Sequence, residues 1–122
     1  VCFTDVDTII RECDFISLHL PLTQETRHIL NKENLKRAKS NLIIVNTARG
    51  GLLDEDALYE LLKERKLYGL GLDVFEQEPP QNSKLLTLPN VIVSSHTAAS
   101  TQEAINAMSR MAVENLICSL EA

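Results

Sequence analysis

The run Leu42-Ile43-Ile44-Val45 is apolar at every position, and it constrains the fold more than any other segment. A strand with one face in water alternates apolar and polar residues, whereas a strand covered on both faces reads as a continuous apolar run. We therefore expect a buried strand over residues 42–45, with helices packed against each side of its sheet.

Similar strand patterns alternate with helical patterns along the chain. The first helix, over residues 5–13, is indicated by Val6, Ile9, Ile10 and Cys13 at the i, i+3, i+4, i+7 spacing. Asn31 and Asp54 are side chains that cap helices, and Ser100 with Glu103 has the spacing of a capping box. The expected strands are Phe15–Leu20, Leu42–Val45, Leu70–Phe75 and Val91–Val93, and the later helices run from Asn31 to Ala38, from Asp54 to about Lys66, and from Ser100 past Leu116.

This alternation predicts an α/β fold. Strands that alternate with helices form right-handed βαβ units and a parallel sheet. We expect a parallel sheet of about four strands with flanking helices, forming a single domain over residues 1–122. A length of 122 residues with 44% hydrophobic content suffices for one compact core.

Charge and cysteine usage exclude several classes of function. A net charge of −5 argues against a surface for nucleic acid or for an anionic membrane, both of which need clustered Lys and Arg. No apolar run approaches the roughly 18 residues of a spanning helix. Cys2, Cys13 and Cys118 form no C-x-x-C pair, so we expect reduced thiols, no metal site and, with no signal-peptide profile, a cytoplasmic location.

The residues that follow the expected strands carry most of the chemistry. In an open α/β sheet, ligands bind beyond the carboxyl ends of the strands. Arg49 follows the second expected strand, Glu78 follows the third, and His96 follows the fourth. Because parallel strands end at one edge of their sheet, we expect these three side chains to gather along one rim.

Each of the three has a chemical and a structural interpretation. Arg49 precedes two glycines, which allow close backbone approach or positive φ, and its guanidinium matches a carboxylate. A histidine such as His96 exchanges protons near neutral pH, and a carboxylate at Glu78, held extended by Pro79, would favour its imidazolium form. The alternatives are an exposed arginine, a histidine bound to a backbone carbonyl, and a solvated loop glutamate; neighbouring Glu76 fits that last description better.

Other constellations carry less weight. Gly69-Leu70-Gly71 lies inside an expected strand and lacks the third glycine of a dinucleotide fingerprint. Ser94-Ser95-His96 has no G-x-S-x-G elbow, which argues against a hydrolase nucleophile. His19 and His28 have no convincing ligand partner, and we expect structural roles for both.

Taken in order, the motifs resemble a known family. They are Leu18-His19-Leu20-Pro21-Leu22-Thr23 with Thr26 and Ile29, Asn46-Thr47-Ala48-Arg49-Gly50-Gly51, Asp73-Val74-Phe75 with Glu78-Pro79, and His96 before Ala98-Ala99. As a set, the motifs are similar to those of the D-isomer-specific 2-hydroxyacid dehydrogenases, and the resemblance covers essentially the whole chain.

The resemblance implies a role for each motif residue. Arg49 would bind the carboxylate and keto oxygen of a small 2-hydroxy or 2-oxo acid, such as 3-phosphoglycerate or glyoxylate/hydroxypyruvate. His96 would exchange the proton as hydride moves to or from the nicotinamide, and Glu78 would hold His96. The cofactor would be NAD, with NADP as the alternative, and its expected contacts are Leu20, Pro21, Thr47, Ala48, Arg49, Asp73, His96, Ala98 and Ala99.

The sequence departs from the family in one large respect. Members carry a G-x-G-x-x-G turn and an acidic residue about 20 positions later, and both would lie before Val1. We therefore expect the second half of a Rossmann-type domain, without its first half and without a substrate-binding domain. Such a chain alone should be inactive and bind NAD weakly or not at all. Its exposed edge strand should favour a homo-oligomer.

Two readings from other classes stay open. One is a non-catalytic NAD-sensing or interaction domain of dehydrogenase ancestry, which can keep all three rim residues. The other is a flavodoxin-like or receiver-like signalling domain. A receiver needs an acidic cluster at its first strand and a phosphoacceptor aspartate at a strand end, whereas Asp73 lies within a longer motif.

Overall fold

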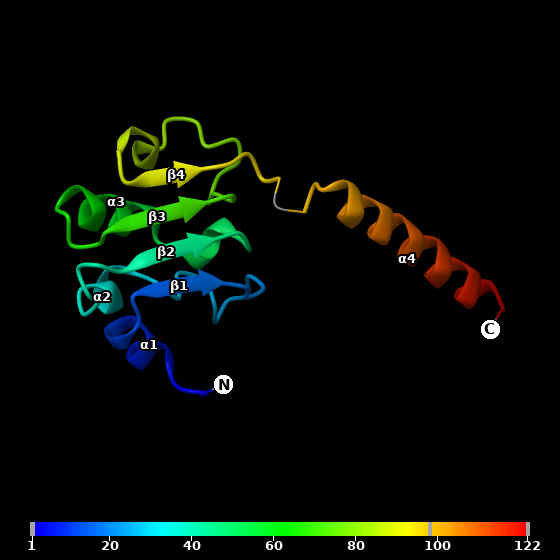
Figure 1. Cartoon of the computed structure of the whole chain (residues 1–122), viewed down its shortest axis with the longest axis horizontal. Helices are drawn as coiled ribbons and strands as arrows, with labels where there is room; N and C mark the ends of the chain where they lie inside the picture. Colours follow the sequence, from blue (N-terminus) through cyan, green and yellow to red (C-terminus); the bar gives the residue numbers. More distant parts are fainter. Residues whose placement is uncertain (1, 98, 122) are drawn as a thin grey trace.

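The computed structural model describes residues 2–97 and 99–121. Within them a four-stranded parallel sheet has the order β1-β2-β3-β4, so each strand pairs with the next along the chain (Figure 1). The predicted parallel α/β fold is therefore confirmed. The strands are β1 (Phe15–Leu18), β2 (Ile43–Asn46), β3 (Gly69–Leu72) and β4 (Val91–Val93).

The carboxyl ends of the strands lie at one edge of the sheet. Leu18 is opposite Asn46, Asn46 is opposite Leu72, and Leu72 is opposite Val93. This common end is also why β1 and β3 are shorter than predicted. Beyond Asn46 the chain turns away, so the neighbouring strands lose their pairing partner, and β1 and β3 end at Leu18 and Leu72.

Helices precede, connect and follow the strands. The Asn31 side chain accepts hydrogen bonds from the N–H groups of Glu33 and Asn34, and Asp54 accepts one from Ala57 (3.0 Å), which confirms both predicted caps. The helices are α1 (Val6–Glu12), α2 (Lys32–Leu35), α3 (Glu55–Lys63) and α4 (Gln102–Glu121), and 3₁₀ turns cover Gly50–Leu52 and Lys84–Thr87.

Three helix boundaries were predicted wrongly. Helix α3 ends at Lys63 rather than near Lys66, where the positive φ of Arg65 (54°) turns the chain out of the helix. The helix expected to reach Ala38 ends at Leu35, because the next bonds run over three residues, from Ala38 N–H to the Leu35 carbonyl, and tighten the chain. The Ser100 capping box is wrong as well. The Thr101 hydroxyl accepts from the Ala104 N–H at 3.1 Å, so α4 begins one residue after Thr101.

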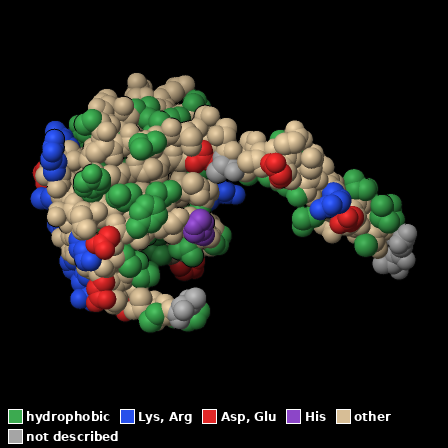
Figure 2. Space-filling view, in the orientation of Figure 1, with side chains coloured by type: hydrophobic (Ala, Val, Ile, Leu, Met, Phe, Trp, Pro, Cys, Tyr) green, Lys and Arg blue, Asp and Glu red, His purple; other side chains and the backbone are tan. Residues whose placement is uncertain are grey.

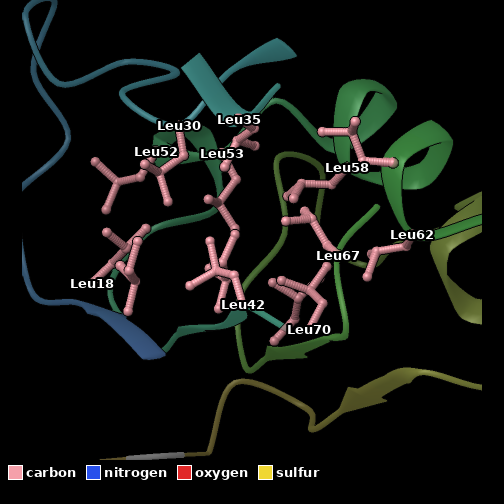
Figure 3. Packing of buried hydrophobic residues seen from close by; sticks show 14 of the residues in the cluster. Leu18, Leu30, Leu35, Leu42, Leu52, Leu53, Leu58, Leu62, Leu67 and Leu70 are labelled. Atoms are coloured by element: carbon pink, nitrogen blue, oxygen red, sulfur yellow. The ribbon is translucent and has the colours of Figure 1, made fainter. Parts of the chain in front are cut away.

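The hydrophobic core lies on one face of the sheet. Alternate strand residues, among them Leu18, Ile44 and Leu70, pack with leucines of the helices and connecting segments (Figure 3). The opposite face carries Ile43 and Val45, which are only partly buried. The expectation that helices cover both faces of residues 42–45 is therefore wrong for the described residues. Consecutive strand order with right-handed connections places all connecting helices on the same side.

Helix α4 extends away from the sheet (Figure 1). The residues predicted to form its apolar side are exposed, with Met108 at 57% and Leu116 at 60%. Figure 2 shows hydrophobic side chains on the surface of this helix. Cys2, Cys13 and Cys118 are free thiols. Among the residues that the structure describes, no helix combines the length and the apolar character needed to cross a membrane.

Candidate active site

His96 and Glu78 are hydrogen-bonded to each other beyond the carboxyl ends of β3 and β4. The Nδ1 atom of His96 lies 2.7 Å from Oε2 of Glu78, while Oε1 of Glu78 accepts a hydrogen bond from the Phe75 N–H (3.1 Å). The His96 side chain is 53% exposed. With Nδ1 engaged, Nε2 is the ring nitrogen through which His96 can exchange a proton with a ligand.

These contacts change the acidity of Glu78. Its pKa lies below the usual 4.5, first because His96 hydrogen-bonds to the carboxylate and then because the Phe75 N–H does so. Bonds to the charged form of a carboxylate favour that form. Glu78 is therefore a carboxylate at neutral pH, able to orient the His96 ring and stabilise positive charge on it.

The backbone at His96 is held from both sides. Its φ of 57° lies in the left-handed region, which few residues other than glycine adopt. The ring is bound to Glu78, and the N–H of the next residue, Thr97, donates to Oδ1 of Asp73 at 2.9 Å. The surrounding contacts thus fix an unfavourable conformation, which is common where a side chain must be aimed.

Asp73 anchors the segment that begins just after β3. It is almost completely buried (3% exposed), and its Oδ1 also accepts from the Ser94 hydroxyl at 2.5 Å. Its own N–H donates to the Asn46 carbonyl at 3.0 Å. Asp73 thereby connects the ends of β2, β3 and β4, next to the His96–Glu78 pair.

A surface pocket of about 510 Å³ opens beside the pair. Its walls come from Asp73, Phe75 and residues 78–80, from residues 93–96 and from Leu86, with Asp73, Glu78 and His96 among the polar groups. Arg49 lies outside this pocket, at the end of β2. The structure therefore brings Glu78 and His96 into contact. Arg49 lies on the same edge of the sheet, and among the described residues its side chain makes no hydrogen bond or ion pair with either of them.

The turn over residues 46–51, called the 46–51 turn below, carries Arg49. Asn46 is fully buried; its side chain donates to the Arg49 carbonyl (2.9 Å) and accepts from the Ala48 N–H (3.1 Å). The Arg49 guanidinium is exposed and donates to the Ala48 carbonyl at 2.6 Å. It contacts no carboxylate among the described ion pairs, so it is available for an anionic ligand.

Gly50 shows why a glycine follows Arg49. Its φ is not positive, and a Cβ at this position would lie well under 3.0 Å from main-chain atoms of Phe75 and Glu76. Of the two reasons expected for this glycine, close backbone approach is therefore the correct one. The 46–51 turn and the segment over residues 73–80, called the 73–80 loop below, pack main chain against main chain.

The other predicted cofactor contacts lie on the same edge. Leu20 (40% exposed), Pro21 and Thr47 are exposed, Ala48 is partly buried, and Ala99 is exposed after β4. Ala98 lies outside the described residues.

Sequence reasoning missed a second polar cluster behind the rim. Glu76 is an exposed loop glutamate, as expected, but it is also paired: its carboxylate contacts Nε2 of His28, and its N–H donates to Oε1 of Glu55 at 2.7 Å. The structural role expected for His28 is consistent with this pair. No local pattern signals the contact, because 48 residues separate the partners.

Comparisons with known proteins agree with the geometry. Residues 1–98 match the family model described as D-isomer specific 2-hydroxyacid dehydrogenase, NAD binding domain. The chain is 55% identical to a hydroxypyruvate reductase of Thermotoga maritima over 84% of its length, and 52% identical to a D-3-phosphoglycerate dehydrogenase of Methanocaldococcus jannaschii over 92%. It spans only 34% and 21% of those two relatives.

A solved structure gives the same picture. The NAD complex of a D-isomer specific 2-hydroxyacid dehydrogenase from Lactobacillus delbrueckii ssp. bulgaricus superimposes with a TM-score of 0.90 at 30% identity. The match covers 98% of this chain and 41% of that one. The sheet and its helices are thus those of a Rossmann-type nucleotide-binding domain.

Proposed function

Because the chain belongs to the D-isomer specific 2-hydroxyacid dehydrogenase family, we propose that it is part of an oxidoreductase acting on a D-2-hydroxy acid and its 2-oxo acid. The observation that carries this proposal is the His96–Glu78 pair at the carboxyl edge of the sheet. Proton transfer to a keto oxygen needs an acid held in place, and this pair supplies one.

Arg49, His96 and Glu78 have separate roles in this proposal. Arg49 binds the substrate carboxylate through its guanidinium, which is exposed and forms no ion pair within the described residues. His96 donates a proton from Nε2 to the keto oxygen in reduction and accepts it in oxidation. Glu78 keeps Nδ1 of His96 engaged and stabilises the imidazolium. Acid–base catalysis of this kind contributes about 10²–10⁴ in rate.

The proposed cofactor is NAD, with NADP as the alternative. When bound, a nicotinamide supplies or accepts the hydride, and that chemistry belongs to the cofactor. Asp73 would meet its carboxamide, and Leu20, Pro21, Thr47, Ala48, Ala98 and Ala99 would line it. The substrates we propose are 3-phosphoglycerate or glyoxylate/hydroxypyruvate.

The 122 residues form, in this proposal, the second half of the Rossmann-type domain of a longer enzyme. The printed sequence has no G-x-G-x-x-G turn for a diphosphate, so we expect the isolated chain to lack turnover. We further propose a cytoplasmic location and a homo-oligomer. β1 and β4 are edge strands of the sheet, and an exposed edge strand can pair with a second chain.

The proposal can be tested by steady-state kinetics on the longer enzyme of which, in this proposal, the chain is a part. NADH with glyoxylate or hydroxypyruvate, and NAD with 3-phosphoglycerate, are the substrates to assay. We expect His96→Ala to lower kcat by about 10²–10⁴ with little change in the KM for NADH, and Arg49→Lys to raise the KM for the oxo acid. Glu12→Ala, an exposed position on α1, is the matched control.

The outcomes separate the two classes of function. If the wild type is active and His96→Ala has the same kcat, the catalytic role of His96 is contradicted. A wild type that binds NADH but turns over none of these acids supports the non-catalytic NAD-sensing domain instead.

A further inference from the structure

His28 touches two of the segments that carry the rim. Its N–H donates to the Gly51 carbonyl at 2.9 Å, which ties it to the 46–51 turn. Its ring Nε2 is paired with the carboxylate of Glu76 in the 73–80 loop. His28 itself belongs to the segment after β1. One residue therefore links the segments that follow β1, β2 and β3.

Its conformation indicates a constrained position. His28 has a φ of 49°, in the left-handed region, where a side chain is disfavoured without compensating contacts. The side chain of Asn31, the cap of α2, donates to the His28 carbonyl at 3.1 Å. His28 is thus bound through its N–H, its carbonyl and its ring.

Glu76 is held from a second direction. Its N–H donates to Oε1 of Glu55, in the first turn of α3. Burial raises the pKa of Glu55, and the nearby Glu76 and Asp56 charges raise it further, whereas the Glu76 N–H lowers it. The carboxylates of Glu55 and Glu76 therefore lie close together. The His28 ring donates to the Glu76 carboxylate, and this hydrogen bond joins the 73–80 loop to the segment after β1.

The loop that is held in this way also carries Glu78. It is fixed at its start by Asp73, bound to Ser94 and Thr97, and at its end by the Glu78–His96 pair. Between these points, the described side-chain bonds to other segments are those at Glu76. Gly50 packs against the loop main chain at the same place.

From this geometry we propose that His28 and Glu55 are positioning residues, which clamp Glu76 and so set Glu78 and His96 relative to Arg49. This inference rests on the proposed function for its catalytic meaning. The clamp acts through the loop main chain, because neither His28 nor Glu55 contacts His96 or Arg49 in the described hydrogen bonds. A misplacement of about 1 Å at a catalytic group costs about 10² in rate.

The titration of Glu78 measures the clamp without any turnover. In the 122-residue chain, the side-chain carboxyl carbon of Glu78 can be followed by NMR as pH falls. We expect wild type to titrate below 4.5. His28→Ala should move the midpoint of Glu78 back toward 4.5, because a loosened loop loses the Phe75 and His96 bonds to the carboxylate.

Rescue and control variants separate positioning from a general loss of structure. His28→Gln keeps a donor near the place of Nε2 and should restore the wild-type titration. Glu76→Ala, at a side chain 33% exposed, breaks the same link on a loop and serves if His28→Ala does not fold. Glu12→Ala should leave Glu78 unchanged.

Kinetics of the longer protein complete the test. His28→Ala and Glu76→Ala should lower kcat by about 10² with the KM for NADH unchanged, and His28→Gln should recover most of it. An unchanged Glu78 titration in both disruptive variants overturns the clamp. A wild type without turnover overturns the proposed function instead, while the titration still decides the clamp.

Discussion

Replacement of Gly50 by alanine tests how tightly the 46–51 turn packs against the 73–80 loop. The added Cβ would lie well under 3.0 Å from the carbonyl group of Phe75 and the N–H of Glu76, and contacts that short are essentially never seen. All these neighbours are main-chain atoms, so no side-chain rotation relieves the clash. One of the two segments must move by about 1 Å or more.

The energetic cost follows from this displacement. Overpacking of a filled interior costs about 1–3 kcal/mol, and a clash against main chain belongs at the upper end. In a domain of this size each kcal/mol lowers Tm by about 4 °C. We therefore expect Gly50→Ala to lower the free energy of unfolding by about 3 kcal/mol and Tm by about 12 °C, as measured by urea and thermal unfolding followed by circular dichroism.

Gly69→Ala is the matched control. A Cβ there meets the Asn90 carbonyl oxygen at 3.5 Å, an ordinary contact, and the φ of Gly69 is not positive. Loss of glycine also restricts the unfolded chain, so we expect a change within about 1 kcal/mol, in the stabilising direction. If Gly50→Ala is as stable as wild type, or if the two variants lose equal stability, the close packing inferred for Gly50 is wrong.

Three further outcomes follow from the structure. Asn46→Ala should lower the free energy of unfolding by about 1–3 kcal/mol in chemical denaturation, because it removes a buried partner of the 46–51 turn; a loss under about 0.5 kcal/mol would contradict this role. The folded pKa of Glu78 is depressed, so its pair with His96 adds stability above the usual 4.5 that disappears as pH falls through the folded value. The Tm difference between wild type and His96→Ala should therefore shrink as pH falls below 4.5, and a constant difference would refute the assignment. Sedimentation should show self-association that Ile92→Lys, on edge strand β4 and 78% exposed in wild type, abolishes; a monomeric wild type at high concentration speaks against it.

Local patterns predicted the parts of the fold that local physics decides. The apolar runs gave the four parallel strands, and the Asn31 and Asp54 caps were correct. The prediction that helices cover both faces of the sheet at residues 42–45 was wrong. The sequence of one strand does not show whether other parts of the chain pack on both of its faces. The start of α4 was wrong because neighbouring Ser100 and Thr101 offer similar hydroxyls.

The candidate site divides in the same manner. Topology placed Arg49, Glu78 and His96 on one edge, and the Glu78–His96 contact is present. The roles of these residues stay predictions. The pairing of His28 with Glu76 was not foreseen, since it joins two loops whose relative position exists only after the sheet has formed.

Because each strand pairs with its neighbour along the chain, the strands can pair in the order in which a ribosome delivers them. Arg49 becomes available once β2 has docked, whereas the His96–Glu78 pair closes only after β4 has joined. We predict that contacts completed last contribute little to the folding transition state, so that His96→Ala accelerates unfolding and leaves the folding rate almost unchanged, as stopped-flow unfolding and refolding would measure.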